Sequence, residues 1–94
     1  MLRESPQTRY DSRHAANRIS RTIGHLRLVK SMVEADADCT DVLIQLAAVR
    51  GQIDSICGSL TVQYAEQFAE DYRRTGDQEM LTAFKSDLAK AIKK

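Results

Sequence analysis

Apolar residues in the middle of this chain recur at alternating steps of three and four. The series is Cys39, Val42, Leu46, Val49, Ile53, Ile56 and Leu60. This spacing is typical of a helix that packs against another helix along one seam. The first helix-ending signal after the seam is Thr75-Gly76, so we expect one long helix over residues 39–73. At about 1.5 Å per residue this helix spans roughly 50 Å, more than the rest of the chain can cover.

A shorter helix is expected on each side of the long one. The first covers residues 6–35, with Ser5 as N-cap and Pro6 at the first helical position, or else starts later, at Asp11 or Ser12. Its apolar residues keep near-helical spacing; they are Ala16, Ile19, Ile23, Leu26 and Val33. The other covers residues 77–93.

Capping residues mark the ends of these helices. Asp36 or Asp38 can cap the second helix, Gly76 can end it, and Asp77 can cap the third. Strand signals are absent. The sequence therefore predicts an all-α fold, a three-helix subunit in one domain over residues 1–94.

The chain has 94 residues, and only 5% of them are aromatic. A domain of this size buries only roughly 60–65% of the surface that its unfolded chain exposes, so its stability is low and association commonly adds to it. We expect a homo-oligomer, either a dimer or a tetramer. No apolar window is long enough to cross a membrane and no secretory signal is visible, so two cysteines favour free thiols in the cytoplasm.

Basic residues gather at the start of the chain. Residues 1–30 hold seven Arg and Lys against two acids, although the whole chain has a net charge of +1. At about 100° per residue, one stripe of the first helix holds His14, Arg18, Arg21 and His25. Arginines in a stripe suit a phosphate backbone. An ordinary solvated face is the alternative interpretation, and the eleven-residue step between the histidines is not that of a helical metal pair.

The most informative residue is Cys39, in the first turn of the long helix. Backbone N–H groups there favour a thiolate, while Asp36, Asp38 and Asp41 oppose it. A buried structural thiol is the alternative. Cys57, between Ile56 and Gly58, is expected in the core. Nothing in the sequence has the spacing of a catalytic site, so we expect no enzyme and no cofactor.

Three segments carry a resemblance to a known family. They are RISR-x-x-G-x-L at 18–26, MVE at 32–34, and C-x-D-V-L-x-Q-L-A-A-V-R at 39–50. Together they resemble the CsoR/RcnR/FrmR family of bacterial repressors, which respond to copper, nickel or cobalt, or formaldehyde. The resemblance implies three-helix subunits that dimerise and pair into a disc-shaped tetramer. It also implies binding of double-stranded operator DNA until a small effector releases it. The residues that the resemblance implies in DNA binding are Arg18, Arg21, Arg27, Lys30 and Arg50, and the polar stripe of the first helix adds His14.

The chain departs from the family at its effector site. The resemblance implies a metal held by Cys39 and by two residues of a partner subunit, but those two positions are Tyr64 and Phe68. Phenylalanine has no donor atom, and tyrosine is a poor ligand for Cu(I). The formaldehyde branch uses an N-terminal proline amine, whereas Pro6 is internal, and the persulfide branch needs a second cysteine where Phe68 stands.

The sequence thus predicts a repressor in which Cys39, walled by Tyr64 and Phe68, senses a thiol-reactive signal: an aldehyde, an oxidant or reactive sulfur. Two alternatives stay open. One is a metal-responsive repressor that uses Cys39 with His14 or His25. The other is a helical assembly protein without an effector.

Overall fold

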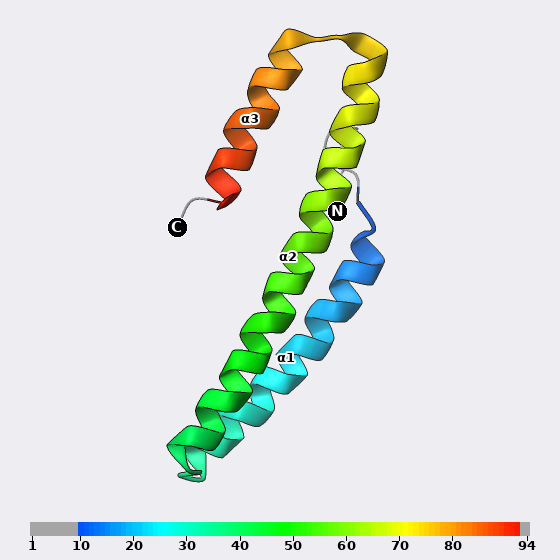
Figure 1. The fold of residues 1–94 in the computed structure, drawn as a ribbon. Coiled ribbons are helices and arrows are strands. Elements are labelled where there is room, and N and C mark those ends of the chain that lie inside the picture. Colours follow the sequence, from blue (N-terminus) through cyan, green and yellow to red (C-terminus); the bar gives the residue numbers. More distant parts are fainter. Residues whose placement is uncertain (1–9, 93–94) are drawn as a thin grey trace. The chain divides into compact units, whose positions relative to one another are not determined.

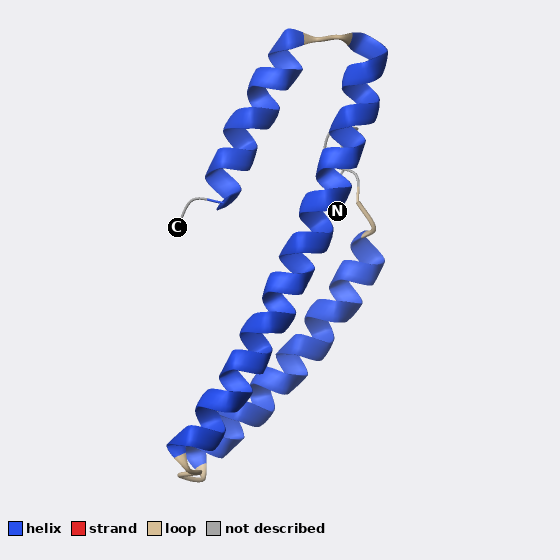
Figure 2. Ribbon diagram, viewed as in Figure 1, coloured by secondary structure: helices blue, strands red, loops and turns tan. Residues whose placement is uncertain are grey.

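The computed structural model describes residues 10–92 and consists of three α-helices joined by two short loops (Figures 1 and 2). They are α1 (Ser12–Glu34), α2 (Cys39–Thr75) and α3 (Gln78–Ile92). No strand occurs between residues 10 and 92. The prediction of an all-α subunit with a long second helix is confirmed, and none of the described helices is long and apolar enough to cross a membrane.

The chain divides into two compact units, and the division falls within α2. Residues 11–61 form one unit, in which α1 runs antiparallel beside the first part of α2 (Figure 1). Residues 62–92 belong to the other unit, which holds the end of α2 and all of α3. The single domain expected over residues 1–94 stays a prediction.

The later of the two expected starts of α1 is the observed one. Asp11 is the N-cap, and its side-chain Oδ1 accepts a hydrogen bond of 3.1 Å from the backbone N–H of His14. Satisfying a free N–H in the first turn is what an N-cap does. The expected continuous helix over residues 6–35 is therefore wrong at Tyr10 and Asp11, which are not helical. Ser5 and Pro6 themselves lie outside the described residues.

Local capping also sets the other helix ends. Asp38, and not Asp36, caps α2, since Asp38 Oδ2 accepts from Thr40 N–H at 3.1 Å. Asp77 caps α3 by accepting from Glu79 N–H at 2.9 Å. Between α2 and α3, Gly76 has φ +63°, a left-handed conformation that side chains with a Cβ disfavour.

Replacing Gly76 with alanine should therefore destabilise the protein by about 1 kcal/mol. Nothing lies within 4 Å of a Cβ built at this glycine, so the cost comes from the backbone conformation and not from a clash. Urea unfolding followed by circular dichroism would measure it. Gly58→Ala is the control: Gly58 is helical, has the same open surroundings, and should gain stability from the substitution.

Within residues 11–61 the two helices meet along a narrow row of side chains. The row is Ala15, Thr22 and Val29 on α1, with Val49 and Ile56 on α2, each at most 8% exposed. Successive members on each helix are seven residues apart, or two turns, so each helix contributes a single line of contact. This row is the whole buried core of the unit.

The predicted seam of α2 is only partly used by this contact. Val49 and Ile56 are buried, whereas Leu46 and Ile53 are 40% and 46% exposed. Cys57 is also exposed, so its expected place in the core is wrong within one subunit. The reason is that a seam about 100° wide exceeds what one neighbouring helix covers.

A second group of apolar side chains remains exposed on the same two helices. We call it the apolar face; its members are Ile19, Ile23, Leu26 and Val33 of α1 and Leu46 and Ile53 of α2, all 40–55% exposed. On each helix they lie on one side of the buried row, by the angular spacing of about 100° per residue. Residues 10–92 therefore leave the predicted apolar stripe of α1 largely uncovered.

Candidate nucleic-acid interface

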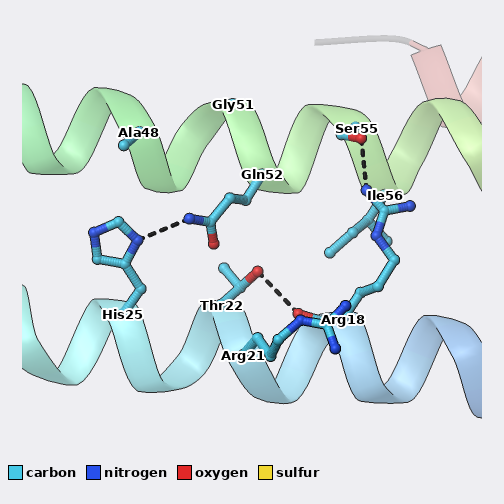
Figure 3. Close-up of a pocket in the computed structure, with 9 residues that line it drawn as sticks. All are labelled: Arg18, Arg21, Thr22, His25, Ala48, Gly51, Gln52, Ser55 and Ile56. Carbon is cyan, nitrogen blue, oxygen red and sulfur yellow. Dashed lines mark hydrogen bonds between the residues drawn. The ribbon is translucent and has the colours of Figure 1, made fainter.

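The basic stripe predicted on α1 does not lie wholly in solvent, because two of its members turn toward α2. The Arg18 guanidinium donates from Nη2 to Ser55 Oγ at 2.6 Å. Next to it, the Thr22 hydroxyl is buried and donates to the carbonyl oxygen of Arg18 at 3.1 Å. Arg18 is thus held by a side chain of the opposite helix (Figure 3).

His25 lies one heptad after Arg18 and is held from both sides by glutamines of α2. Its Nε2 is 2.8 Å from Gln45 Oε1, and its Nδ1 is 2.8 Å from Gln52 Nε2. A carboxamide oxygen only accepts and a carboxamide nitrogen only donates. Both ring nitrogens of His25 are therefore engaged by α2, and neither is open to a metal.

These residues line an open groove of about 590 Å³ between α1 and α2 (Figure 3). The lining residues are Arg18, Arg21, Thr22, His25, Ala48, Gly51, Gln52, Ser55 and Ile56. Two of the lining residues are arginines and none is acidic. On the α2 side, the small residues Ala48 and Gly51 keep the groove open. The groove lies on the opposite side of the buried row from the apolar face, by the same angular spacing.

The remaining residues predicted to bind DNA are all exposed but do not line this groove. His14 lies in the first turn of α1, on the groove side by angular spacing. Lys30 lies on the side of the apolar face, where its Nζ is 3.9 Å from Glu34. By the same spacing, Arg50 also lies on the side of the apolar face, and Arg27 lies nearly opposite the buried row. The structure therefore brings together Arg18 and Arg21, with His14 nearby, and separates them from Arg27, Lys30 and Arg50.

Cys39 is the first residue of α2 and is exposed, as is Cys57. Among residues 10–92 no three His, Cys, Asp or Glu side chains lie close enough together to hold a metal ion. Cys39 belongs to the unit of residues 11–61, whereas Tyr64 and Phe68 belong to the other unit. Their joint pocket, which was expected across two subunits, stays a prediction.

Tyr64 and Phe68 take part in an aromatic cluster inside their own unit. Phe84 of α3 stacks on Phe68 with ring centroids 4.1 Å apart, and its ring lies 5.1 Å from that of Tyr64. The Tyr64 hydroxyl donates to Asp87 Oδ2 at 3.3 Å. Partial burial and then the Asp87 carboxylate raise the pKa of Tyr64 above its ordinary value. Both side chains therefore serve the packing of α2 against α3.

Sequence reasoning missed the three α2 side chains that hold the basic stripe: Gln45, Gln52 and Ser55. A signal for them exists in the angular spacing, since all three lie on one side of the line through Val49 and Ile56. It becomes visible only when the contacting face of α2 is known, because each partner lies 20 to 37 residues away in sequence.

Comparison with known proteins shows the family of this chain. Residues 11–94 match the family described as "Metal-sensitive transcriptional repressor". The chain belongs to this family of metal-sensitive transcriptional repressors. Consistent with this, the chain is 31% identical over 78 residues to the copper-sensing transcriptional repressor CsoR of Bacillus subtilis (strain 168), which covers 83% of this chain and 77% of that protein. No solved structure is significantly similar to the chain.

Membership of the metal-sensitive repressors confirms the family predicted from the sequence and the expectation that the chain is not an enzyme. The metal-ligand set that the resemblance implied does not fit this chain at two of its three positions. Phe68 has no donor atom and is stacked on another phenylalanine, and the hydroxyl of Tyr64 is hydrogen-bonded to Asp87 within the same subunit. Any metal bound at Cys39 would need other donors.

Proposed function

We propose that the protein is a DNA-binding transcriptional repressor that works as a homo-oligomer and releases its operator when an effector reaches Cys39. The observation that carries this proposal is the groove between α1 and α2, which has two arginines and no acid among its lining residues. Fixed cations without compensating acids attract the phosphate backbone and give salt-dependent binding. Such a role places the protein in the cytoplasm, with the operator DNA.

The apolar face supports the oligomer in this proposal. Six large apolar side chains on two adjacent helices are 40–55% exposed, and contiguous apolar surface of this kind marks protein–protein contact. The face and the groove lie on opposite sides of the buried row. A second subunit on the face therefore leaves the groove open to DNA.

The family description and the copper-sensing relative make a metal the better supported effector, and they give no support to a thiol-reactive signal. The pairing of Cys39 with His25 is disfavoured, because both ring nitrogens of His25 are engaged. His14 begins α1 and Cys39 begins the antiparallel α2, so within one subunit almost the whole length of α1, roughly 30 Å, separates them. Cys39 with donors of a partner subunit is therefore the metal hypothesis to test. One observation still favours thiol chemistry as a second candidate: Cys39 is exposed, while Tyr64 and Phe68 supply no good ligand.

Replacing Cys39 with alanine should abolish release from DNA and leave DNA binding intact, because the variant has no Cys39 thiol for the effector to bind. Fluorescence anisotropy of a labelled duplex from upstream of the gene would follow release by Cu(I), Ni(II), formaldehyde and sodium tetrasulfide in turn. Cys57→Ala is the matched control, because it removes the other exposed thiol and should keep the response.

The effector class is identified by a reagent that releases the wild-type and Cys57→Ala proteins from DNA but does not release Cys39→Ala. Release of Cys39→Ala by the same reagent at the same concentration would disprove sensing at Cys39. A protein that binds no duplex between about 50 and 200 mM salt, where phosphate contacts should change affinity steeply, would instead be the helical assembly protein.

A further inference from the structure

The unit of residues 62–92 contains a cavity of about 290 Å³ between α2 and α3. Its lining combines aromatic rings with carboxylates. The rings are those of Tyr64, Phe68 and Phe84, and the carboxylates are those of Asp77, Glu79 and Asp87. None of the described residues that line the cavity is basic. The cavity therefore places three formal negative charges beside apolar surface, and no cation among its described walls compensates them.

Two of these carboxylates have a structural role at the start of α3, and the third does not. Asp77 Oδ1 accepts from the N–H groups of Glu79 and Met80 at 2.9 and 3.4 Å. Glu79 lies in the first turn of α3, where the helix dipole favours an acid. Asp87 lies well inside α3, and its Oδ2 accepts from the Tyr64 hydroxyl at 3.3 Å. This bond leaves the second oxygen of Asp87, Oδ1, for a ligand.

The placement of the carboxylates decides between a metal ion and a larger cation. No three His, Cys, Asp or Glu side chains within residues 10–92 are placed to hold a metal ion, so the three carboxylates do not converge on one point. The cavity is also roughly ten times the ~30 Å³ that a water molecule takes up in the liquid. An organic ammonium ion fits both observations, because its carbon atoms can fill the apolar part while its N–H groups reach a carboxylate.

The aromatic rings add a second attraction for such a cation. The face of an aromatic ring carries partial negative charge and attracts an ammonium group within about 6 Å of its centroid. The ring of Phe84 packs against two others, at centroid distances of 4.1 Å from Phe68 and 5.1 Å from Tyr64. After burial, the Asp87 carboxylate is the second cause of the raised pKa of Tyr64, which indicates a negative potential beside these rings.

We propose that this cavity binds a small organic ammonium ion, held by the carboxylates of Asp87 and Glu79 and by the rings of Tyr64, Phe68 and Phe84. A primary alkylamine resembles the lysine side chain, whose pKa is about 10.4, and is therefore protonated at neutral pH. The site uses neither Cys39 nor the groove between α1 and α2. It is thus a second ligand site, independent of the proposed function.

The experiment titrates the full chain with three probes of similar size. They are n-butylamine, 1,4-diaminobutane and the uncharged 1-butanol. Met80 lines the cavity, so its ¹³C-labelled methyl group reports binding by NMR, and Met32 of α1 is the internal reference. We expect both amines to shift the Met80 signal, while 1-butanol at the same concentration leaves it unchanged.

Two substitutions test the two parts of the site. Asp87→Asn removes a charge at nearly constant shape and should raise the amine dissociation constants at least about fivefold, the effect of one opposite charge at about 4 Å in water. Ala83→Leu fills the cavity and should abolish the shift. The matched controls are Glu66→Gln and Ala89→Leu, which change exposed residues outside the lining and should stay within about twofold of wild type. Circular dichroism confirms that each variant is folded.

Four outcomes would overturn the proposal. One is a Met80 signal that neither amine shifts, or that 1-butanol shifts equally. Another is an equal loss of affinity in the control variants. A shift caused by Zn(II) and not by the amines would assign the cavity to a metal ion. If the wild type ignores the amines and Asp87→Asn changes the oligomeric state in sedimentation velocity, a cationic side chain of another copy occupies the cavity instead.

Discussion

Replacing Ile53 with aspartate should break the oligomer into subunits. Ile53 lies on the apolar face and is 46% exposed in the single chain. If a second subunit covers this face, the new carboxylate is buried against apolar side chains, at a cost of several kcal/mol per site. In a symmetric dimer the substitution occurs twice, so the dissociation constant should rise by about two orders of magnitude or more. Sedimentation velocity over a range of protein concentrations measures the change.

The control for this experiment is Ile44→Asp. Ile44 is on the same helix and is more exposed, at 59%, but lies on the other side of the buried row. This variant should still form at least a dimer. Dissociation of both variants to the same degree would show that the apolar face is not the contact surface, and an Ile53→Asp protein with the wild-type mass would show the same.

Replacing Arg18 and Arg21 together with glutamine should remove most of the DNA affinity. Both arginines line the groove, and each phosphate contact that is lost reduces the slope of log affinity against log salt by about 0.9. Because the change recurs in every subunit that touches the duplex, we expect a loss on the order of 100-fold near 0.1 M salt. Anisotropy at several salt concentrations gives both the affinity and the slope.

Lys85→Gln with Lys90→Gln is the charge-matched control, since it removes the same formal charge from α3. That protein should keep nearly the wild-type slope. Melting curves are needed beside the binding data, because Arg18 also bonds Ser55 and its loss should cost about 1 kcal/mol of stability. A double arginine variant that is folded and has an unchanged slope would remove the groove from the DNA-binding surface.

The helices and their ends could be predicted because the signals are local. Asp38, Gly76 and Asp77 each influence only the backbone next to them. Each has a role that the sequence predicted, although Asp36 was an equal candidate for the cap of α2. The start of α1 was ambiguous because local signals allow a cap at either of two residues, Ser5 or Asp11. The family was also visible, because its motif is a continuous string after Cys39.

The faces through which α1 and α2 contact each other could not be predicted, because several sides of each helix are able to pack against the other helix. On α1, Ile19 and Leu26 are larger and more apolar than Ala15 and Thr22, yet the smaller residues face α2. Small side chains let two helices approach closely, and the larger ones are left for another contact. The hydrogen bonds of His25 to Gln45 and Gln52 follow from that choice of face, so the sequence alone gave no reason to expect them.

The narrow buried row has a consequence for gene dosage. Five side chains, two of them an alanine and a threonine, are the only buried contact between α1 and α2, so a lone subunit gains little free energy on folding. If assembly supplies the rest, the folded fraction rises with the number of copies in the cell. At protein concentrations below saturation of the proposed operator, halving expression should then reduce occupancy by more than half, because the total amount and the folded fraction of the protein both fall.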